Sequence, residues 1–283
     1  MNSVFEDAER ELPGLRFSAL AVDVDSGETL FSHRPELVLD TASVGKVFLL
    51  HRLLTEVDAG ARTLEDRVTR RPSEWMDNSG LWYLLQADTL SLYDVAALIG
   101  AVSDNAATNT LCRVIGLPAV QEHTRSLGYE DSGLDDVVRW PLPPGAPRTL
   151  SHATAEDLVR FVSRTATASD LSPASADTLQ RWLGAGMDLS MVASAFGLDP
   201  LAHYYFDRDV WLWNKTGTIS TVRADTGLVM SPDRRIAYAV LANWPRATDA
   251  RDCVLSAMRA AGDQLRLALR NGSGNSRPHE NGL

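Results

Sequence analysis

Two residues at the start of a strongly apolar segment could carry out nucleophilic chemistry. Ser43 and Lys46 are separated by two residues, and the apolar run 47–50 follows directly. A serine hydroxyl attacks a carbonyl carbon only when a base takes its proton, and residues three apart on a helix lie on one face, so Lys46 can reach Ser43. The spacing alone is a weak signal, because a chain of this length should contain about one such pair by chance.

Two further motifs strengthen this interpretation. They are Ser103-Asp104-Asn105 and Lys215-Thr216-Gly217, each expected well under about 0.1 times per chain by chance. The three motifs follow one another as in active-site serine β-lactamases and penicillin-binding proteins. The chain resembles the class A β-lactamase family here: Ser103 lies sixty positions after Ser43, Asn109 completes Ser-Asp-Asn-x-x-x-Asn, and Thr218 completes Lys-Thr-Gly-Thr. The likeness covers most of residues 14–270.

The lysine must be neutral to act as a base. Burial against the apolar run and the charge of Lys215, if the fold brings it close, both lower the pKa of Lys46. The resemblance implies that Ser43 is the nucleophile, that Lys46 is its base, and that Ser103 relays a proton to the leaving nitrogen. It also implies an oxyanion hole formed by the backbone N–H groups of Ser43 and Thr218.

The remaining motif residues are assigned to substrate binding. The resemblance implies that Asn105 holds the side-chain amide of the substrate, and that Lys215, Thr216 and Thr218 bind its carboxylate. Gly217 keeps the strand edge open for close backbone approach.

Arg223 is a further candidate for carboxylate binding. It follows Lys215 by eight residues, on the next strand of a predicted hairpin, where an arginine is common in the family. Its register differs by about one position. The alternative is a surface ion pair with Asp225.

The sequence departs from the family in one loop. Class A enzymes have a Glu-x-x-Leu-Asn segment whose glutamate positions the water that hydrolyses the acyl-enzyme, and counting from Leu127-Gly128 puts its position near Val138. No such segment follows, and the nearest acids, Asp135 and Asp136, are expected to be solvated. Acylation of Ser43 is therefore well supported, whereas deacylation has no obvious general base.

These residues predict a serine hydrolase that acts through an acyl-enzyme, with β-lactam hydrolysis as the first interpretation and slow deacylation as its consequence. The alternatives are an esterase or acyltransferase on the same scaffold, or a non-hydrolysing penicillin-binding or recognition protein. The expected partner is a small molecule that carries a carboxylate. The oligomeric state is left open.

The order of predicted elements favours an α+β fold of three layers, as in β-lactamases. Periodicity predicts helices at 43–59, 92–100, 106–115, 155–165, 176–183 and 249–269, and strands from residue 16, at 210–214, 222–230 and 236–243. We expect one domain over 1–270, with an antiparallel sheet from about 13–40 and 185–270 and a helical part from about 41–184. Residues 131–150 read as a loop, and 271–283 as a disordered tail.

Composition excludes several other classes. The net charge of -10, without a basic stripe, argues against nucleic acid as a partner, and no run approaches the roughly 18 apolar residues of a membrane span. Two cysteines and six histidines without metal-binding spacing imply no metal site, and no cofactor is expected. The acidic, polar opening residues favour a cytoplasmic protein, or a secreted one if a leader was removed.

Overall fold

The computed structural model describes residues 2–203 and 210–272. The predicted tail at 271–283 overlaps the end of the last helix, and the rest of it lies outside the described residues. Among the described residues, no helix is long and apolar enough to cross a membrane.

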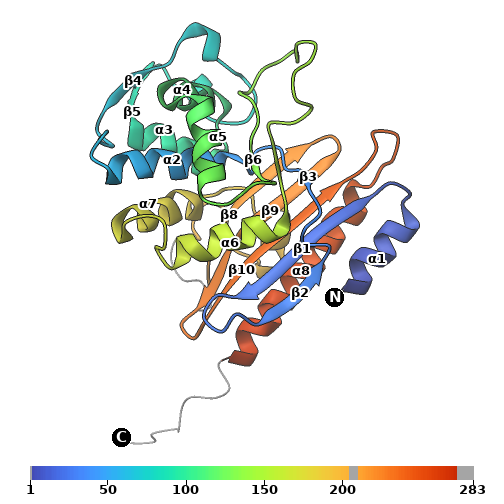
Figure 1. Ribbon diagram of the computed structural model, residues 1–283. Helices are drawn as coiled ribbons and strands as arrows, with labels where there is room; N and C mark the ends of the chain where they lie inside the picture. Colours follow the sequence, from blue (N-terminus) through green and yellow to red (C-terminus); the bar gives the residue numbers. More distant parts are fainter. Residues whose placement is uncertain (1, 204–209, 273–283) are drawn as a thin grey trace, which may run out of the picture.

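A five-stranded antiparallel sheet forms the middle layer, in the order β2-β1-β10-β9-β8 (Figure 1). Its strands are β1 (Arg16–Asp23), β2 (Thr29–His33), β8 (Trp211–Ile219), β9 (Val222–Ser231) and β10 (Arg234–Asn243). Strands from the two ends of the chain are joined where β1 pairs with β10, as predicted. The motif strand β8 is an edge strand, so one side of its backbone is free to face a ligand.

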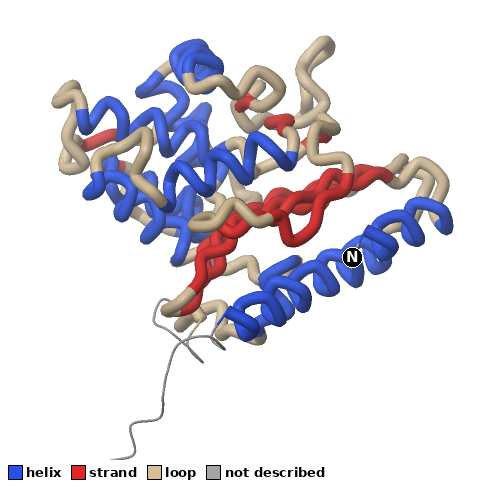
Figure 2. The backbone as a smooth tube through the Cα atoms, turned by 60° about the horizontal axis from the view of Figure 1, so that its bottom comes forward, coloured by secondary structure: helices blue, strands red, loops and turns tan. Residues whose placement is uncertain are grey.

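Two helices cover one face of this sheet. They are α1 (Asn2–Glu11) and α8 (Arg251–Gly272), and Figure 2 shows both below the sheet when it is seen edge-on. The short helix η3 (Val192–Phe196) packs against α8 on the same side. The buried residues between these helices and the sheet include Phe17, Leu212 and Tyr238.

The middle of the chain forms the layer on the opposite face. Its helices are α2 (Lys46–Asp58), α3 (Leu92–Val102), α4 (Asn105–Ile115), α5 (Leu117–Ser126), α6 (Ala155–Ala166) and α7 (Pro173–Gly184). Short pieces between them are β3 (Leu39–Asp40), β4 (Arg67–Thr69), η1 (Pro72–Glu74), η2 (Trp82–Leu84), β5 (Thr89–Ser91), β6 (Gly133–Leu134) and β7 (Ser151–Ala153). The family's three-layer architecture is thus present.

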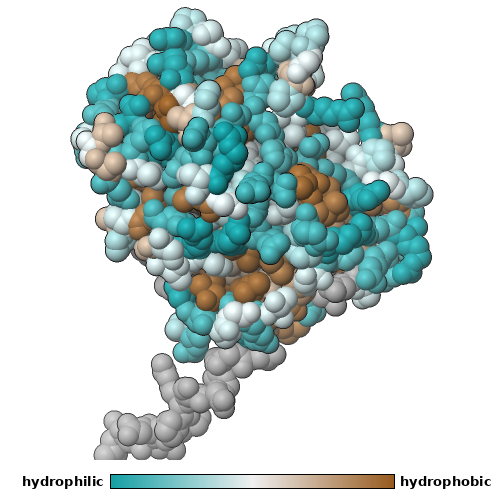
Figure 3. Space-filling model, in the orientation of Figure 1, coloured by the Kyte–Doolittle hydropathy of each residue, from teal (hydrophilic) through white to brown (hydrophobic). Residues whose placement is uncertain are grey.

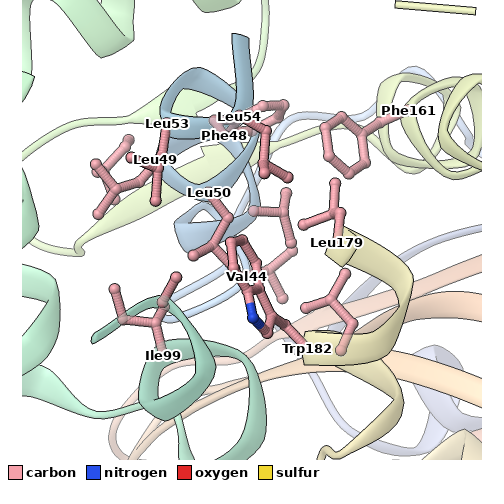
Figure 4. Close-up of a cluster of buried hydrophobic side chains, with 14 of the residues drawn as sticks. Val44, Phe48, Leu49, Leu50, Leu53, Leu54, Ile99, Phe161, Leu179 and Trp182 are labelled. Atoms are coloured by element: carbon pink, nitrogen blue, oxygen red, sulfur yellow. The ribbon is translucent and has the colours of Figure 1, made fainter. Parts of the chain in front are cut away.

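Helix α2 lies at the centre of the helical layer. Its residues Phe48, Leu49 and Leu50 are essentially inaccessible to solvent. In Figure 4, Phe48 lies on the side of the helix that faces Phe161, and Leu49 lies on the opposite side. On the face of the molecule seen in Figure 3, small groups of hydrophobic residues lie among hydrophilic ones, in contrast to the continuous apolar packing around α2. The apolar run after Ser43 therefore anchors the segment that carries the predicted nucleophile.

Two predicted boundaries differ from the structure. The helix predicted over 43–59 begins at Lys46. The residues before it form a turn instead of a first helical turn, and the Gly45 amide in this turn donates a hydrogen bond to the Ser151 hydroxyl. The predicted loop 131–150 contains the short strand β6, which pairs with β7 and so closes the base of the loop.

Candidate active site

Ser43 lies in a tight turn immediately before α2. The preceding residue, Ala42, has a positive φ of 50°. This backbone conformation is energetically unfavourable for a residue that has a Cβ atom. The turn leads into the helix through hydrogen bonds from the Val44 amide to the Thr41 carbonyl (3.0 Å) and from the Lys46 amide to the Ser43 carbonyl (3.4 Å). Strain next to a partly exposed serine persists only if its surroundings hold it in place.

A fully buried serine holds this turn. The Ser151 hydroxyl donates to the Ala42 carbonyl at 2.7 Å and accepts from the Gly45 amide at 3.0 Å. Because its one hydrogen is used there, the Thr41 hydroxyl, 2.7 Å away, donates to it. Ser151 therefore fixes the backbone on both sides of Ser43.

Strand β8 closes against the same turn from the other side. A Cβ on Gly217 would lie 1.9 Å from the Thr41 carbonyl oxygen and 3.0 Å from the Ser43 amide nitrogen. Any side chain there would push the strand away from the nucleophile. The predicted need for glycine is real, and its structural reason is contact with the Ser43 turn.

The Lys46 side chain is completely buried beneath the nucleophile turn. Its Nζ lies 2.7 Å from the Ser103 carbonyl oxygen, 2.7 Å from Asn105 Oδ1 and 3.2 Å from Ser103 Oγ. Burial, and then the charge of Lys215, hold the pKa of Lys46 well below its usual value of 10.5. A neutral amine has two hydrogens for the two carbonyl oxygens and one lone pair that can receive a proton.

Lys215 approaches the same hydroxyl from β8. Its Nζ donates to Ser103 Oγ at 3.0 Å and to the Thr216 carbonyl at 2.8 Å. Burial lowers the pKa of Lys215 to about 8, and the charges of Asp188 and Asp225 oppose that shift. The Ser103 hydroxyl thus lies between two buried lysine amines, and Ser103 itself has a left-handed φ of 54°.

Asn105 is tied to its neighbours. Its Oδ1 accepts from Lys46, and its Nδ2 donates to Asn78 Oδ1 at 2.8 Å and to the Asn78 carbonyl at 3.0 Å. The amide hydrogens assigned to the substrate are therefore directed at Asn78, and substrate binding by Asn105 stays a prediction. Asp104 supports the adjacent wall, because its Oδ2 accepts from the amides of Leu81 and Trp82, each at 2.7 Å.

A cavity of about 460 Å³ opens beside Ser43. Its lining includes these predicted residues: Ser43, Ser103, Lys215, Thr216 and Thr218. It also includes Gly100, Ala101 and Val102 at the end of α3, and the segment Gly186, Met187 and Asp188 after α7. The fold therefore brings together the motif residues that were assigned to chemistry and to carboxylate binding.

Arg223 does not line this cavity as the described residues define it. Its Nη1 donates to the carbonyls of Ile219 and Val222, both at 2.8 Å, and its guanidinium lies 5.8 Å from the Trp244 ring centre. The alternative partner, Asp225, is fully buried and accepts from Asn214 and Tyr238. Arg223 braces the β8–β9 turn, and its role towards a carboxylate stays a prediction.

The loop residue predicted to correspond to the family's glutamate, Val138, is held by Asn109, and the correspondence itself stays a prediction. Asn109 Nδ2 donates to the Val138 carbonyl at 2.7 Å, and the Val138 amide donates to Asn109 Oδ1 at 2.8 Å. The neighbouring acids are engaged elsewhere: Asp135 is 2.8 Å from His152, and Asp136 pairs with Arg139. The expectation that Asp136 is solvated was wrong, since this ion pair allows it to be 7 % exposed.

Three residues of the site were missed in the sequence. Ser151, Asn78 and Asp188 lie outside the motifs and act through contacts between distant segments. A signal for the lysines was also present: Lys46 and Lys215 are the only lysines among 27 Lys and Arg residues. Arginine cannot be deprotonated in a protein, whereas lysine can. Because almost all basic residues of this chain are arginines, the two lysines stand out as the side-chain amines that could act as bases.

Comparison with known proteins finds solved structures with the same fold. A β-lactamase from Sphaerobacter thermophilus DSM 20745 is 27% identical, with a TM-score of 0.79 over 98% of this chain and 97% of that chain. An L158E mutant of PBP-A, solved as an acyl-enzyme complex with penicillin G, is 21% identical, with a TM-score of 0.77 over 96% and 97%. A class A β-lactamase from Mycobacterium abscessus is 20% identical, with a TM-score of 0.79 over 95% and 99%.

A family model described as the β-lactamase enzyme family matches residues 2–265. That match spans nearly the whole chain and includes every motif residue of the site. The protein therefore belongs to the β-lactamase enzyme family.

Proposed function

We propose that this protein is a serine hydrolase that forms an acyl-enzyme on Ser43 and opens the strained amide of a β-lactam. One observation carries the proposal: the Ser103 hydroxyl lies between two buried amines, 3.2 Å from Lys46 Nζ and 3.0 Å from Lys215 Nζ, in the cavity that contains Ser43. Such a set can take a proton from a nucleophile and return it to a leaving group.

The first step is attack on the carbonyl carbon. Neutral Lys46 takes the Ser43 proton as the oxygen forms its bond to carbon. The negative charge that develops on the carbonyl oxygen is met by the backbone N–H groups of Ser43 and Thr218. Lys215, Thr216 and Thr218 hold the substrate carboxylate, so the reacting atoms arrive in register.

The second step breaks the carbon–nitrogen bond. The nitrogen takes a proton from the Ser103 hydroxyl, which regains one from protonated Lys46. Lys46 is then neutral again, and the product is an ester on Ser43. The transfer from Lys46 to Ser103 runs between groups that already lie 3.2 Å apart.

Release of the acyl group is the slow step in this proposal. Valine occupies position 138, and a hydrocarbon side chain cannot activate water. A second candidate function, a penicillin-binding protein that retains its acyl group, is favoured by this residue and by the acyl-enzyme captured in the related PBP-A variant. The two candidates differ only in the lifetime of the ester.

Mass spectrometry and kinetics test both. Saturating benzylpenicillin should add the mass of the drug to Ser43 in the wild type and add nothing to Ser43→Ala. An unmodified wild-type mass would overturn the proposal. Turnover of a chromogenic cephalosporin and of a p-nitrophenyl ester, measured beside the adduct lifetime, separates a β-lactamase from an esterase and from a trapped penicillin-binding protein.

A further inference from the structure

The cavity beside Ser43 lies on the leaving-group side of the nucleophile. It is lined by Ser103, which in the proposed mechanism gives its proton to the leaving nitrogen, and by Lys215. Asn105, assigned to the acyl side chain, is not among the described residues that line it. The cavity is therefore on the side of the scissile nitrogen and of the substituents that this nitrogen carries.

Asp188 places a fixed carboxylate at the rim of this cavity. Its Oδ1 accepts from the Ser190 hydroxyl at 2.6 Å and from the Ser190 amide at 3.1 Å. Its backbone carbonyl accepts from Asn214 Nδ2 at 3.3 Å, which ties it to β8 next to Lys215. Within the described part of the chain, Oδ2 has no hydrogen-bond donor, and the residue is exposed.

The end of α3 adds negative potential to the same cavity. The helix ends at Val102, its last turn contains no basic residue, and Gly100, Ala101 and Val102 line the cavity. The Met187 amide donates to the Ala101 carbonyl at 2.9 Å, so the segment with Asp188 is joined to this helix end. The C-terminus of a helix carries a partial negative charge and favours cations.

Positive charge is confined to the β8 side of the cavity. Among the described residues that line the cavity, Lys215 is the only cation, and its Nζ donates to Ser103 Oγ and to the Thr216 carbonyl rather than to Asp188. The two charges thus face the cavity separately, with the amine beside Ser103 and the carboxylate further out. A ligand that matches both would carry a carboxylate and a cation on the same fragment.

We propose that the part of the substrate on the side of the scissile nitrogen is zwitterionic, with its carboxylate at Lys215, Thr216 and Thr218 and an ammonium or other cationic group beside Asp188 and the end of α3. This inference rests on the proposed function, because it assumes that Ser103 marks the leaving-group side. The exposed side chains of Leu81 and Met187 line the space between and can pack on the apolar body of that fragment.

A matched pair of cephalosporins tests the inference. Both carry a thienylacetyl side chain, and they differ only at C3, where one has a neutral acetoxymethyl group and the other a pyridiniomethyl group. We expect wild-type protein to be acylated by the cationic compound about threefold to tenfold faster, and the preference to weaken as salt is added. In Asp188→Asn the ratio of the two acylation rates should fall towards one.

The control variant is Asp233→Asn, at the exposed turn between β9 and β10. It removes the same charge from the protein and should keep the wild-type ratio. An equal ratio in wild type and Asp188→Asn would overturn the inference, whatever the absolute rates.

Binding to Ser43→Ala separates this inference from the proposed function. The dissociation constants of the same two compounds are measured there by calorimetry. A cation preference in binding, with no adduct on the wild type, would keep the zwitterion inference and overturn acylation. Adducts on the wild type without any preference would do the reverse.

Discussion

The surroundings of the two lysines contain the polar groups that the proposed chemistry needs, whereas the loop around Val138 lacks one. Around Lys46 and Lys215, every amine reaches an oxygen within 3.2 Å, and the nucleophile turn is held by Ser151 and strand β8. In the loop, Asn109 forms two hydrogen bonds with the backbone of Val138, whose side chain is a hydrocarbon. In the proposed mechanism, this loop therefore has a fixed backbone but no side chain that could activate water for deacylation.

The largest effect is expected from substitution of Lys46. If Lys46 proved dispensable, the proposed difference between the lysine side and the loop side would not hold. Lys46→Met keeps the volume of the buried side chain and removes the base, so the acylation rate should fall by about 10²- to 10⁴-fold. Lys46→Arg should be as slow, because a guanidinium cannot accept the Ser43 proton. Stopped-flow acylation by a β-lactam measures this, and a loss below tenfold in both variants would show that another group is the base.

The opposite side is tested by adding the missing group. In Val138→Glu the carboxylate stands on a backbone already fixed by Asn109, so the lifetime of the acyl-enzyme should shorten by about 10²-fold while acylation changes little. Val137→Glu adds the same charge one residue earlier and should leave the lifetime unchanged. Decay of the adduct in intact-mass spectra measures both. Equal lifetimes in Val138→Glu and wild type would show that the loop lacks more than a side chain.

The brace under the nucleophile gives a smaller effect. Ser151→Ala leaves the Gly45 amide and the Ala42 carbonyl without their partner, so acylation should slow by about tenfold and the free energy of unfolding should fall by about 1–3 kcal/mol. Ser132→Ala is the matched control. That hydroxyl is also buried and donates to Asp157 at 2.8 Å, away from Ser43. Its loss should cost stability without slowing acylation, and equal slowing in both variants would make Ser151 merely structural.

The sequence predicted the residues that meet at the cavity better than the residues that hold them in place. Ser43, Ser103 and Lys215 are found by type and spacing because the chemistry needs a hydroxyl or an amine at each position. Counting from Leu127-Gly128 predicted that Val138 corresponds to the family's glutamate. The structure shows that Asn109 holds the Val138 backbone, and the correspondence stays a prediction.

Supporting residues carry no such signature. Ser151 and Asp188 are an ordinary serine and aspartate whose roles arise only when segments more than twenty-five residues away pack against them. Nothing in the sequence around Asn78 indicates that it accepts the amide hydrogens of Asn105. Hydrogen bonds between distant segments depend on the fold, so periodicity and local motifs could not predict them.

The charge of Lys215 gives the smallest and most direct test. Because burial disfavours the ammonium, its pKa is about 8, so the cation that holds a carboxylate is present below that pH and lost above it. Acylation by a carboxylate-bearing β-lactam should therefore fall about fourfold between pH 7 and 8.5. An uncharged ester should show no such fall, because it needs only neutral Lys46.

The chain contains just two lysines, so the titration can be observed directly. Selective ¹³C labelling of lysine side chains should give two resonances, and Lys215→Met assigns them. We expect the Lys215 signal to titrate near pH 8, and the Lys46 signal to titrate well below 10.5. If both titrate above pH 10, both amines are charged at neutral pH. Lys46 could then not act as the base in the resting protein. The side of the cleft around the two lysines would lack a base, as the loop around Val138 does.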